Sequence, residues 1–151
     1  EGAPEHASAQ QVAARTFEFS EFLVRVLKVR DVGAAFPHKV AYHASCHALR
    51  GLGLREESKM LLHAVKSLEL VPLDEAETCC GFGGVFSVVN PEVSSSMMQA
   101  KIKNIQASGA EFVTMVDPGC LMNIAGGLHK TGSSIRALHL AQILASNGGA
   151  R

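Results

Sequence analysis

Segment 77–84 reads ETCCGFGG, so two cysteines stand side by side and three glycines follow within four positions. The chain has four cysteines in all, and the other two, Cys46 and Cys120, lie far from this pair in sequence, one on each side. Clustered thiolates select zinc or iron–sulfur centres over hard cations such as magnesium and calcium. The fold is therefore constrained: to form one metal centre, it must bring together Cys46, Cys79, Cys80 and Cys120.

Composition excludes several classes of protein. The 151 residues include 14 basic and 14 acidic side chains, so no net charge attracts nucleic acid or an anionic membrane. The hydrophobic content of 47% is typical of a globular domain, and no apolar run is long enough to span a bilayer. Four cysteines are too few for a disulfide-stapled secreted scaffold. We therefore expect a cytoplasmic protein with reduced thiols, and no nucleic-acid partner.

Short apolar segments alternate with segments of helical periodicity along most of the chain. The pattern predicts strands at 39–43, 68–73, 111–116 and 134–138, and helices at 19–27, 54–68, 90–108, from 120 to about 128, and 139–146. Asn90 and Pro91 are typical of a helix start, and Gly109 is typical of a helix stop. Residues 1–14 have no clear period, and we predict a flexible N-terminal segment there, followed by one domain at 15–147.

This alternation predicts a single-domain α/β fold of three layers, with a mainly parallel four-stranded sheet. In such sheets, ligands bind beyond the carboxyl ends of the strands. Cys46 follows the first predicted strand, the vicinal pair follows the second, and Cys120 follows the third. The loops at one sheet edge are therefore expected to gather all four sulfur atoms.

The pattern favours an iron–sulfur centre, with zinc as the alternative. Side chains of neighbouring residues diverge, so Cys79 and Cys80 reach different atoms of a cluster more readily than one tetrahedral ion. The spacing also differs from the paired C-x-x-C knuckles of structural zinc sites. Cys120 at a helix N-terminus would gain from the helix dipole, which favours the thiolate. The amides around Gly81, Gly83 and Gly84 can form a concavity for a negatively charged cluster.

Each of these residues also has an ordinary structural interpretation. A single free cysteine such as Cys46 is often a small buried apolar residue, and the vicinal pair is also compatible with a strained, redox-active disulfide. Gly83 and Gly84 would equally suit a tight turn into a helix. His43 and His47 flank Cys46 and are candidates for ligands, for donors behind the ligands, or for simple hydrogen-bonded histidines. Asn123 is either a helix-face residue or an amide near the site, and we expect Met97, Met98 and Met122 to fill the core.

Three stretches resemble the CCG cysteine-rich domain family, which occurs in heterodisulfide reductases and in the iron–sulfur components of glycolate oxidases. They are YHASCH at 42–47, CCGFGGVFS at 79–87 and DPGCLM at 117–122. Segment 15–22, RTFEFSEF, is similar to the linker between two repeats in the lactate-utilisation branch of this family. The resemblance spans about residues 15–145.

The resemblance implies an iron–sulfur component, with a [4Fe–4S] cluster, of a system that oxidises L-lactate or a related 2-hydroxy acid. It implies that the chain is a C-terminal repeat, partnered by a missing N-terminal repeat and by other subunits, and located peripherally at the inner face of the membrane through them. One departure is clear: the family pattern ends in C-x-x-C, whereas Cys120 is followed by Leu121-Met122-Asn123. Four thiol ligands remain, fewer than the five of the non-cubane centre in heterodisulfide reductases.

The segment GFGG at 81–84 does not match the G-x-G-x-x-G fingerprint of flavin and nicotinamide sites. No residue set for deprotonating a substrate stands out, so the sequence predicts an electron relay and names no catalytic residue. Two rival hypotheses remain open. One is a structural zinc domain that docks partner subunits, and the other is a metal-free thiol–disulfide redox domain.

Overall fold

The computed structural model describes residues 4–147 and contains one four-stranded sheet in which all strands are parallel. The strand order is β2-β1-β3-β4, so β1 lies between the strands that follow it in sequence. The strands are β1 Lys39–Tyr42, β2 Glu69–Val71, β3 Phe112–Met115 and β4 Arg136–His139. The predicted parallel sheet of four strands is confirmed.

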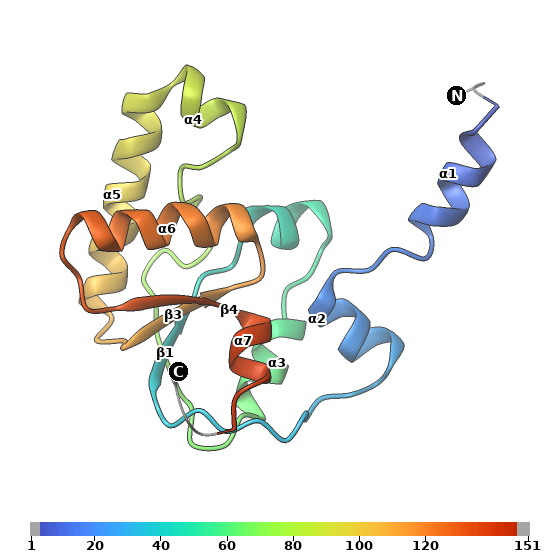
Figure 1. Ribbon diagram of the computed structural model, residues 1–151, viewed down its shortest axis with the longest axis horizontal. Helices are drawn as coiled ribbons and strands as arrows, with labels where there is room; N and C mark the ends of the chain where they lie inside the picture. Colours follow the sequence, from blue (N-terminus) through green and yellow to red (C-terminus); the bar gives the residue numbers. More distant parts are fainter. Residues whose placement is uncertain (1–3, 148–151) are drawn as a thin grey trace.

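Helices cover both faces of this sheet, which gives the three predicted layers (Figure 1). Helices α5 (Pro91–Ala107) and α6 (Pro118–Lys130) cover one face. Helices α3 (Glu57–His63) and α7 (Leu140–Leu144) cover the other, together with the π-helical turn η1 (Phe22–Val26). Successive strand residues point to opposite faces. Accordingly, Val40 packs in the cluster with α3 and α7, and Ala41 packs in the cluster with α5 and α6.

The limits of the observed helices differ from the predicted ones, and two of the differences have a clear cause. Helix α6 begins at Pro118, two residues before Cys120, because the side chain of Asp117 caps it by accepting a hydrogen bond from the Cys120 amide at 2.9 Å. Helix α3 is shorter than the predicted 54–68, and Ser67 beyond its end has a φ of 62°. This left-handed residue turns the chain into β2.

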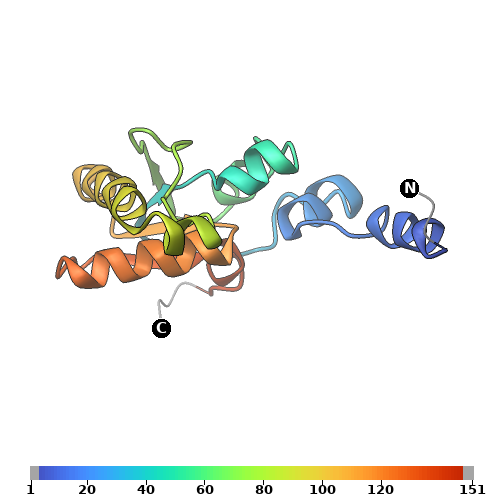
Figure 2. The same ribbon diagram turned by 90° about the horizontal axis from the view of Figure 1, so that it is seen from above.

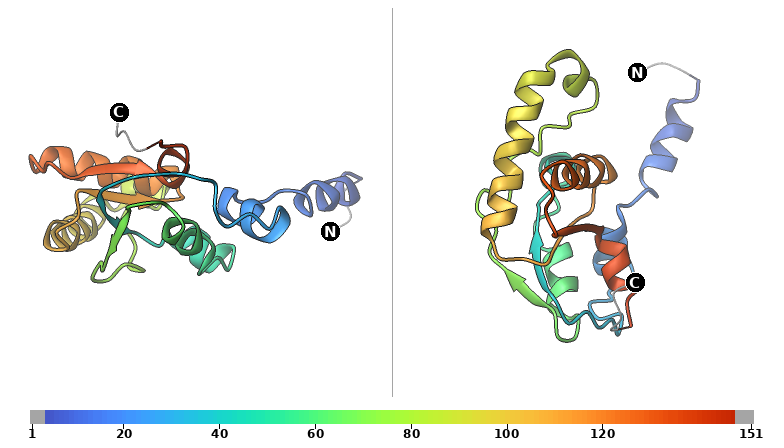
Figure 3. Two further views of the ribbon diagram at one scale, coloured as in Figure 1. Left: turned by 90° about the horizontal axis from the view of Figure 1, so that it is seen from below. Right: turned by 60° about the vertical axis from the view of Figure 1, so that its left-hand side comes forward.

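The N-terminal part of the chain projects from the body of the domain (Figures 2 and 3). It contains α1 (His6–Ala13), which the sequence pattern does not predict, and α2 (Phe19–Glu21), which leads into η1. Helix α1 buries no residue, and an isolated helix of this length is marginal in water. Residues 1–3 of the segment predicted to be flexible lie outside the described residues, and the flexibility of 1–14 stays a prediction.

Two further short helical segments were not predicted, and both adjoin cysteines. The π-helical turn η2 (His47–Gly51) follows Cys46 directly, and α4 (Val85–Val89) follows the glycines of the CCGFGG segment. Each is one turn or slightly more, too short to show a hydrophobic period. Within residues 4–147, no helix has the length and apolar content needed to cross a bilayer.

A buried carboxylate joins η1 to α3. Arg25 donates from Nε to Oε1 of Glu57 at 2.8 Å, and its Nη2 lies 2.7 Å from the same oxygen. The other oxygen, Oε2, accepts the amides of Arg55 and Glu56 at 3.1 and 3.2 Å. Burial raises the pKa of Glu57, but hydrogen bonds from backbone amides and from Arg25 outweigh this effect, so the net pKa lies below its ordinary value.

We expect Glu57→Gln to lower the free energy of unfolding by about 1–2 kcal/mol at neutral pH, because it removes the charge that these donors share. A carboxyl group with a lowered folded pKa stabilises the protein fully above its unfolded pKa of about 4.3. The difference between the parent and the variant should therefore be constant above that pH and shrink as the pH falls through the lower folded pKa. Urea unfolding at several pH values measures this difference.

Glu56→Gln is the matched control, because Glu56 is the neighbouring residue and its side chain is 67% exposed. Its Lys59 contact is 3.6 Å long and exposed, so we expect no measurable loss of stability. A Glu57→Gln effect that did not change between pH 7 and pH 3 would contradict the charge-based explanation.

Candidate metal centre

The cysteines lie beyond the carboxyl ends of three neighbouring strands. The chain leaves β1 toward β2 on one side of the sheet and later returns to β3 on the other side, so the crossover direction reverses between β1 and β3. Parallel α/β sheets bind ligands at such a switch point. Cys46 and Cys120 follow these two strands, and the vicinal pair follows β2. The arrangement agrees with the sequence prediction.

Three buried side chains converge at this edge: His43, Cys80 and Cys120. The nitrogen of His43 and the two sulfur atoms all lie within 4.8 Å of one another. His43 directly follows β1, and its amide donates to the carbonyl of Thr114 on β3 at 2.9 Å, which continues the sheet pairing by one residue. This pairing fixes the imidazole at the switch point.

The other two thiols form a second, half-buried pair. Cys46 contacts the thiol of Cys79, and this contact affects the ionisation of Cys79. The amide of Gly81 donates to Sγ of Cys79 at 3.3 Å, and the amide of Phe82 stabilises the thiolate of Cys80. Two successive amides therefore point at the two neighbouring sulfur atoms, as the predicted amide concavity requires. The vicinal cysteines direct their side chains to different partners.

The buried pair shares a proton unequally. A hydrogen bond with Cys120 is the main cause that lowers the pKa of Cys80 to about 4, and it outweighs burial, which raises this pKa. The same contact raises the pKa of Cys120 well above its ordinary value, and burial adds to the effect. The contact therefore favours one thiolate and one thiol in this buried pair. The Cys80 contact and burial outweigh the expected gain of Cys120 from the helix dipole, and Asp117 at the same helix end raises its pKa slightly further.

His43 has the hydrogen bonding of a metal ligand. Its Nδ1 lies 3.1 Å from the carbonyl oxygen of Ala76, which can only accept, so Nδ1 carries the proton. Its Nε2 is buried and makes no hydrogen bond of normal geometry within residues 4–147, although the ring lies close enough to Cys80 to lower the pKa of that thiol. A metal-binding histidine typically donates its other ring N–H to a carbonyl in this way. The buried hydroxyls of Ser45 and Thr114 also make no hydrogen bond of normal geometry in the described part of the chain, although Ser45 lies close enough to Cys120 to lower its pKa. The donor set therefore fits a thiophilic metal ion or an iron–sulfur cluster.

Side chains from two elements hold the loop that precedes the vicinal cysteines. Three successive carbonyls at 74–76 each accept a hydrogen bond: the first from Nδ2 of Asn104 at 3.3 Å, the second from Nζ of Lys101, and the third from Nδ1 of His43. Lys101 and Asn104 belong to α5. The loop is therefore fastened to the helix that covers one face of the sheet and to the end of β1.

Gly81 permits the close approach of this loop to α5. Its φ is 89°, and an added Cβ would lie 2.4 Å from the carbonyl oxygen of Ser94. The hydroxyl of Ser94 donates to the carbonyl of Gly81 at 2.7 Å. Gly83 and Gly84, with φ values of 54° and 58°, instead form the turn into α4, and Gly84 is its N-cap. The interpretation as an amide concavity thus applies to Gly81, and the interpretation as a tight turn applies to Gly83 and Gly84.

The structure places some of the other predicted site residues at the metal centre and others away from it. His43 joins the buried group, whereas His47 is exposed and its ring packs against Gly51. Asn123 donates from Nδ2 to the carbonyl of Cys80 at 2.8 Å, so it supports the site and is not only a helix-face residue. Lys101 was not among the predicted site residues. Its only sequence signal is its position beside the buried Ile102, which makes a lysine unexpected there.

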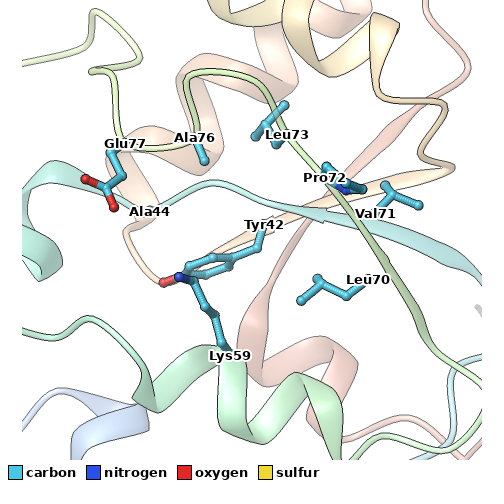
Figure 4. Close-up of a pocket in the computed structure, with 9 residues that line it drawn as sticks. All are labelled: Tyr42, Ala44, Lys59, Leu70, Val71, Pro72, Leu73, Ala76 and Glu77. Atoms are coloured by element: carbon cyan, nitrogen blue, oxygen red, sulfur yellow. The ribbon is translucent and has the colours of Figure 1, made fainter.

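A pocket of about 260 Å³ lies on the β2 side of the site (Figure 4). The ring of Tyr42 lies in it, and Lys59 and Glu77 carry its charged groups. Burial raises the pKa of Tyr42, so its phenol is neutral at physiological pH. The walls are mainly apolar, formed by Ala44, Leu70, Val71, Pro72, Leu73 and Ala76. Ala76 is shared with the metal centre, because its carbonyl accepts the His43 ring N–H.

Helix α4 presents an apolar surface next to the CCGFGG segment. We call it the valine surface: it comprises Val85, Val88 and Val89 of α4 and Val93 in the first turn of α5, with Val88 78% exposed. Met122 on α6 is 60% exposed, so the expectation that it fills the core is wrong. Helix α4 buries none of its residues and lies at the end of the domain where α5 begins (Figure 1). Such a patch on an otherwise folded domain is typical of an interaction surface.

Comparisons with known proteins agree with these features. A sequence model of the family described as a cysteine-rich domain, CCG, matches residues 40–125. Lactate utilization protein A of Exiguobacterium sp. is 50% identical over 136 residues, which are 90% of this chain and 56% of that protein. The proteins of the same name from Shouchella clausii and Geobacillus thermodenitrificans are 48% and 47% identical over 91% and 95% of this chain. The chain spans only 56–60% of the length of these relatives.

We expect Gly81→Ala to destabilise the protein by about 2–4 kcal/mol, because it combines a positive φ with a clash against the backbone of α5. Gly109→Ala is the control: Gly109 also has a positive φ, 69°, but an added Cβ would meet nothing within 4 Å. Its cost should be about 1 kcal/mol. Urea unfolding of both variants measures the two costs. Equal effects would show that the contact with Ser94 does not matter.

Proposed function

This chain belongs to the CCG cysteine-rich domain family, and from that premise we propose that its four thiols hold an iron–sulfur cluster that relays electrons during oxidation of lactate or a related 2-hydroxy acid. The proposed ligands are Cys46, Cys79, Cys80 and Cys120. The observation that carries the proposal is the meeting of two thiol pairs at one edge of a parallel sheet, with a vicinal peptide joining them. The names of the relatives support the place in lactate utilisation.

The chain's own residues would prepare this site in two ways. The amides of Gly81 and Phe82 point at sulfur atoms and stabilise their negative charge. Asn123 and His43 fix the backbone on either side of the vicinal pair through the carbonyls of Cys80 and Ala76. A bound cluster, of which [4Fe–4S] is the proposed type, would supply one-electron transfer.

The site favours electron transfer over substrate chemistry. The only imidazole in the buried group is His43, and its ring nitrogen lies within 4.8 Å of two proposed sulfur ligands, so a bound metal and not a substrate would adjoin it. We therefore assign the 2-hydroxy acid to another part of a larger system. The proposed partners are an N-terminal repeat of a longer protein, which would cover the valine surface, and further oxidoreductase subunits. A cytoplasmic location, peripheral to the membrane through these partners, belongs to the same proposal.

A single zinc ion is the second candidate occupant, and a specific observation favours it. His43, Cys80 and Cys120 already lie within 4.8 Å of one another and offer one nitrogen and two sulfur ligands. Zinc accepts this ligand set in tetrahedral geometry, with a fourth ligand from a thiol or water. In that case the domain would be structural and would dock its partners. The third hypothesis is a metal-free thiol–disulfide domain, which gives the nitrogen of His43 no role as a ligand.

Iron, zinc and acid-labile sulfide per chain, measured on protein purified without oxygen, separate these hypotheses. We expect iron with matching sulfide and a brown colour. Cys46→Ser should abolish the cluster, because the half-buried pair supplies two of its proposed ligands, whereas His43→Gln should only weaken it. A zinc site predicts the reverse order, with His43→Gln the more damaging. Protein that holds neither metal and shows an easily formed disulfide would support the third hypothesis.

In the longer protein, replacing Cys79 and Cys80 together by Ser should abolish the cluster absorbance and lactate-dependent electron transfer. Both losses follow because each residue would bind a different iron atom. Met122→Ser is the control, since this exposed sulfur residue lies near the site in sequence but outside the buried group. Electron transfer is measured with an artificial acceptor, and unchanged turnover in the double variant would refute the relay.

A further inference from the structure

Lys101 is a buried lysine that the proposed function does not yet use. It lies on α5 with 2% of its surface exposed, next in sequence to the core residue Ile102. Lysine is almost never fully buried unless its charge is compensated, because the loss of hydration is costly. A compensating negative charge is therefore expected near its ammonium group.

No carboxylate serves as a close partner of this ammonium group. Among residues 4–147, none has an oxygen within the 4.0 Å of an ion pair to Nζ. The hydrogen bond that Nζ makes goes to an uncharged group, the carbonyl of Glu75. This residue has a φ of 54° and lies in the loop that leads to the vicinal cysteines. The ammonium group is thus placed directly behind that loop.

The negative groups that act on Lys101 come from the metal centre and its loop. Burial lowers the pKa of Lys101, and the largest opposing effect comes from Cys80. Glu75, Cys79 and Cys120 follow in that order. Three of these four groups are proposed metal ligands that approach from two different loops. Their charge grows when a metal replaces the thiol protons, because every sulfur ligand is then a thiolate.

We propose that Lys101 is the counter-cation of the metal centre. Its ammonium group offsets the net negative charge that three or four thiolates leave around a zinc ion or an iron–sulfur cluster. Its hydrogen bond to Glu75 holds that charge at a fixed place behind the cysteine loop. Lys101 is a positioning residue, and this inference rests on the part of the proposed function that places a metal at the thiols, whichever metal it is.

The test compares zinc affinity in variants of the whole 151-residue chain, reduced and free of oxygen, by competition with a chromogenic zinc chelator. Lys101→Gln keeps an N–H donor but removes the charge, and Lys101→Met removes both. Asn104→Leu is the matched control, because it removes the neighbouring hydrogen bond from α5 to the carbonyl of Asp74 without changing any charge. Both Lys101 variants should bind zinc about tenfold more weakly or worse, and Asn104→Leu should bind it as the parent does.

Thermal unfolding with and without zinc separates a charge effect from a folding defect. A ligand that binds the folded state at free concentration L stabilises it by RT ln(1 + L/Kd), so tighter binding gives a larger rise in the melting temperature. We expect the metal-free Lys101→Met protein to melt at or above the parent temperature, because a buried charge is gone. The rise in melting temperature on adding zinc should be smaller in this variant. A structural role alone would lower the metal-free melting temperature and leave the zinc-induced rise unchanged.

Two results would overturn the assignment: parent-like zinc affinity in Lys101→Gln, or an equal loss in Asn104→Leu. Iron and sulfide analysis of the parent decides the proposed function separately. A parent that holds zinc but no iron would refute the electron relay while the zinc titration still decides the role of Lys101. A parent that binds neither metal would overturn both proposals.

Discussion

The contact between the CCGFGG segment and helix α5 is the constraint on which the thiol arrangement depends. Gly81 approaches Ser94 so closely that no side chain fits between them. Helix α5 in turn packs against α6 where Gly127 leaves room, since a Cβ there would lie 2.9 Å from Ile102. Helix α6 carries Cys120. The distance between the vicinal pair and Cys120 is therefore set through two glycine contacts with the same helix.

The buried thiols lie at the edge of an apolar cluster, and this position explains the large shifts in their pKa values. Cys80 and Cys120 are part of the same buried cluster as Ile102, Ile124 and Val113. In such surroundings charges interact more strongly than in water. The unequal sharing of one proton between two sulfur atoms follows from this, as does the influence of the buried Lys101. The half-buried pair, Cys46 and Cys79, is the side of the centre that solvent or a partner can reach.

Sequence patterns predicted what depends on long periodic segments and missed what depends on tertiary contacts. The alternation of strands and helices was enough to place Cys46, Cys79, Cys80 and Cys120 at one edge of the sheet. It was not enough to distinguish His43 from His47, because only the sheet pairing with Thr114 turns one of them inward. Lys101 has no local signature at all, since its burial results from packing against a loop some 26 positions earlier in the chain. Helix α4 was missed because one turn carries no measurable period.

The exposed valines next to this site follow from the way the cysteine loop ends. Gly83 and Gly84 both adopt positive φ, and this turn directs the chain away from the sheet and into α4. A helix formed there buries no residue fully, and its three valines stay exposed within this domain. Burial of these valines would require another surface. A partner that covers the valine surface would touch the segment that begins with Cys79 and Cys80, which is where an electron relay needs its partner to be.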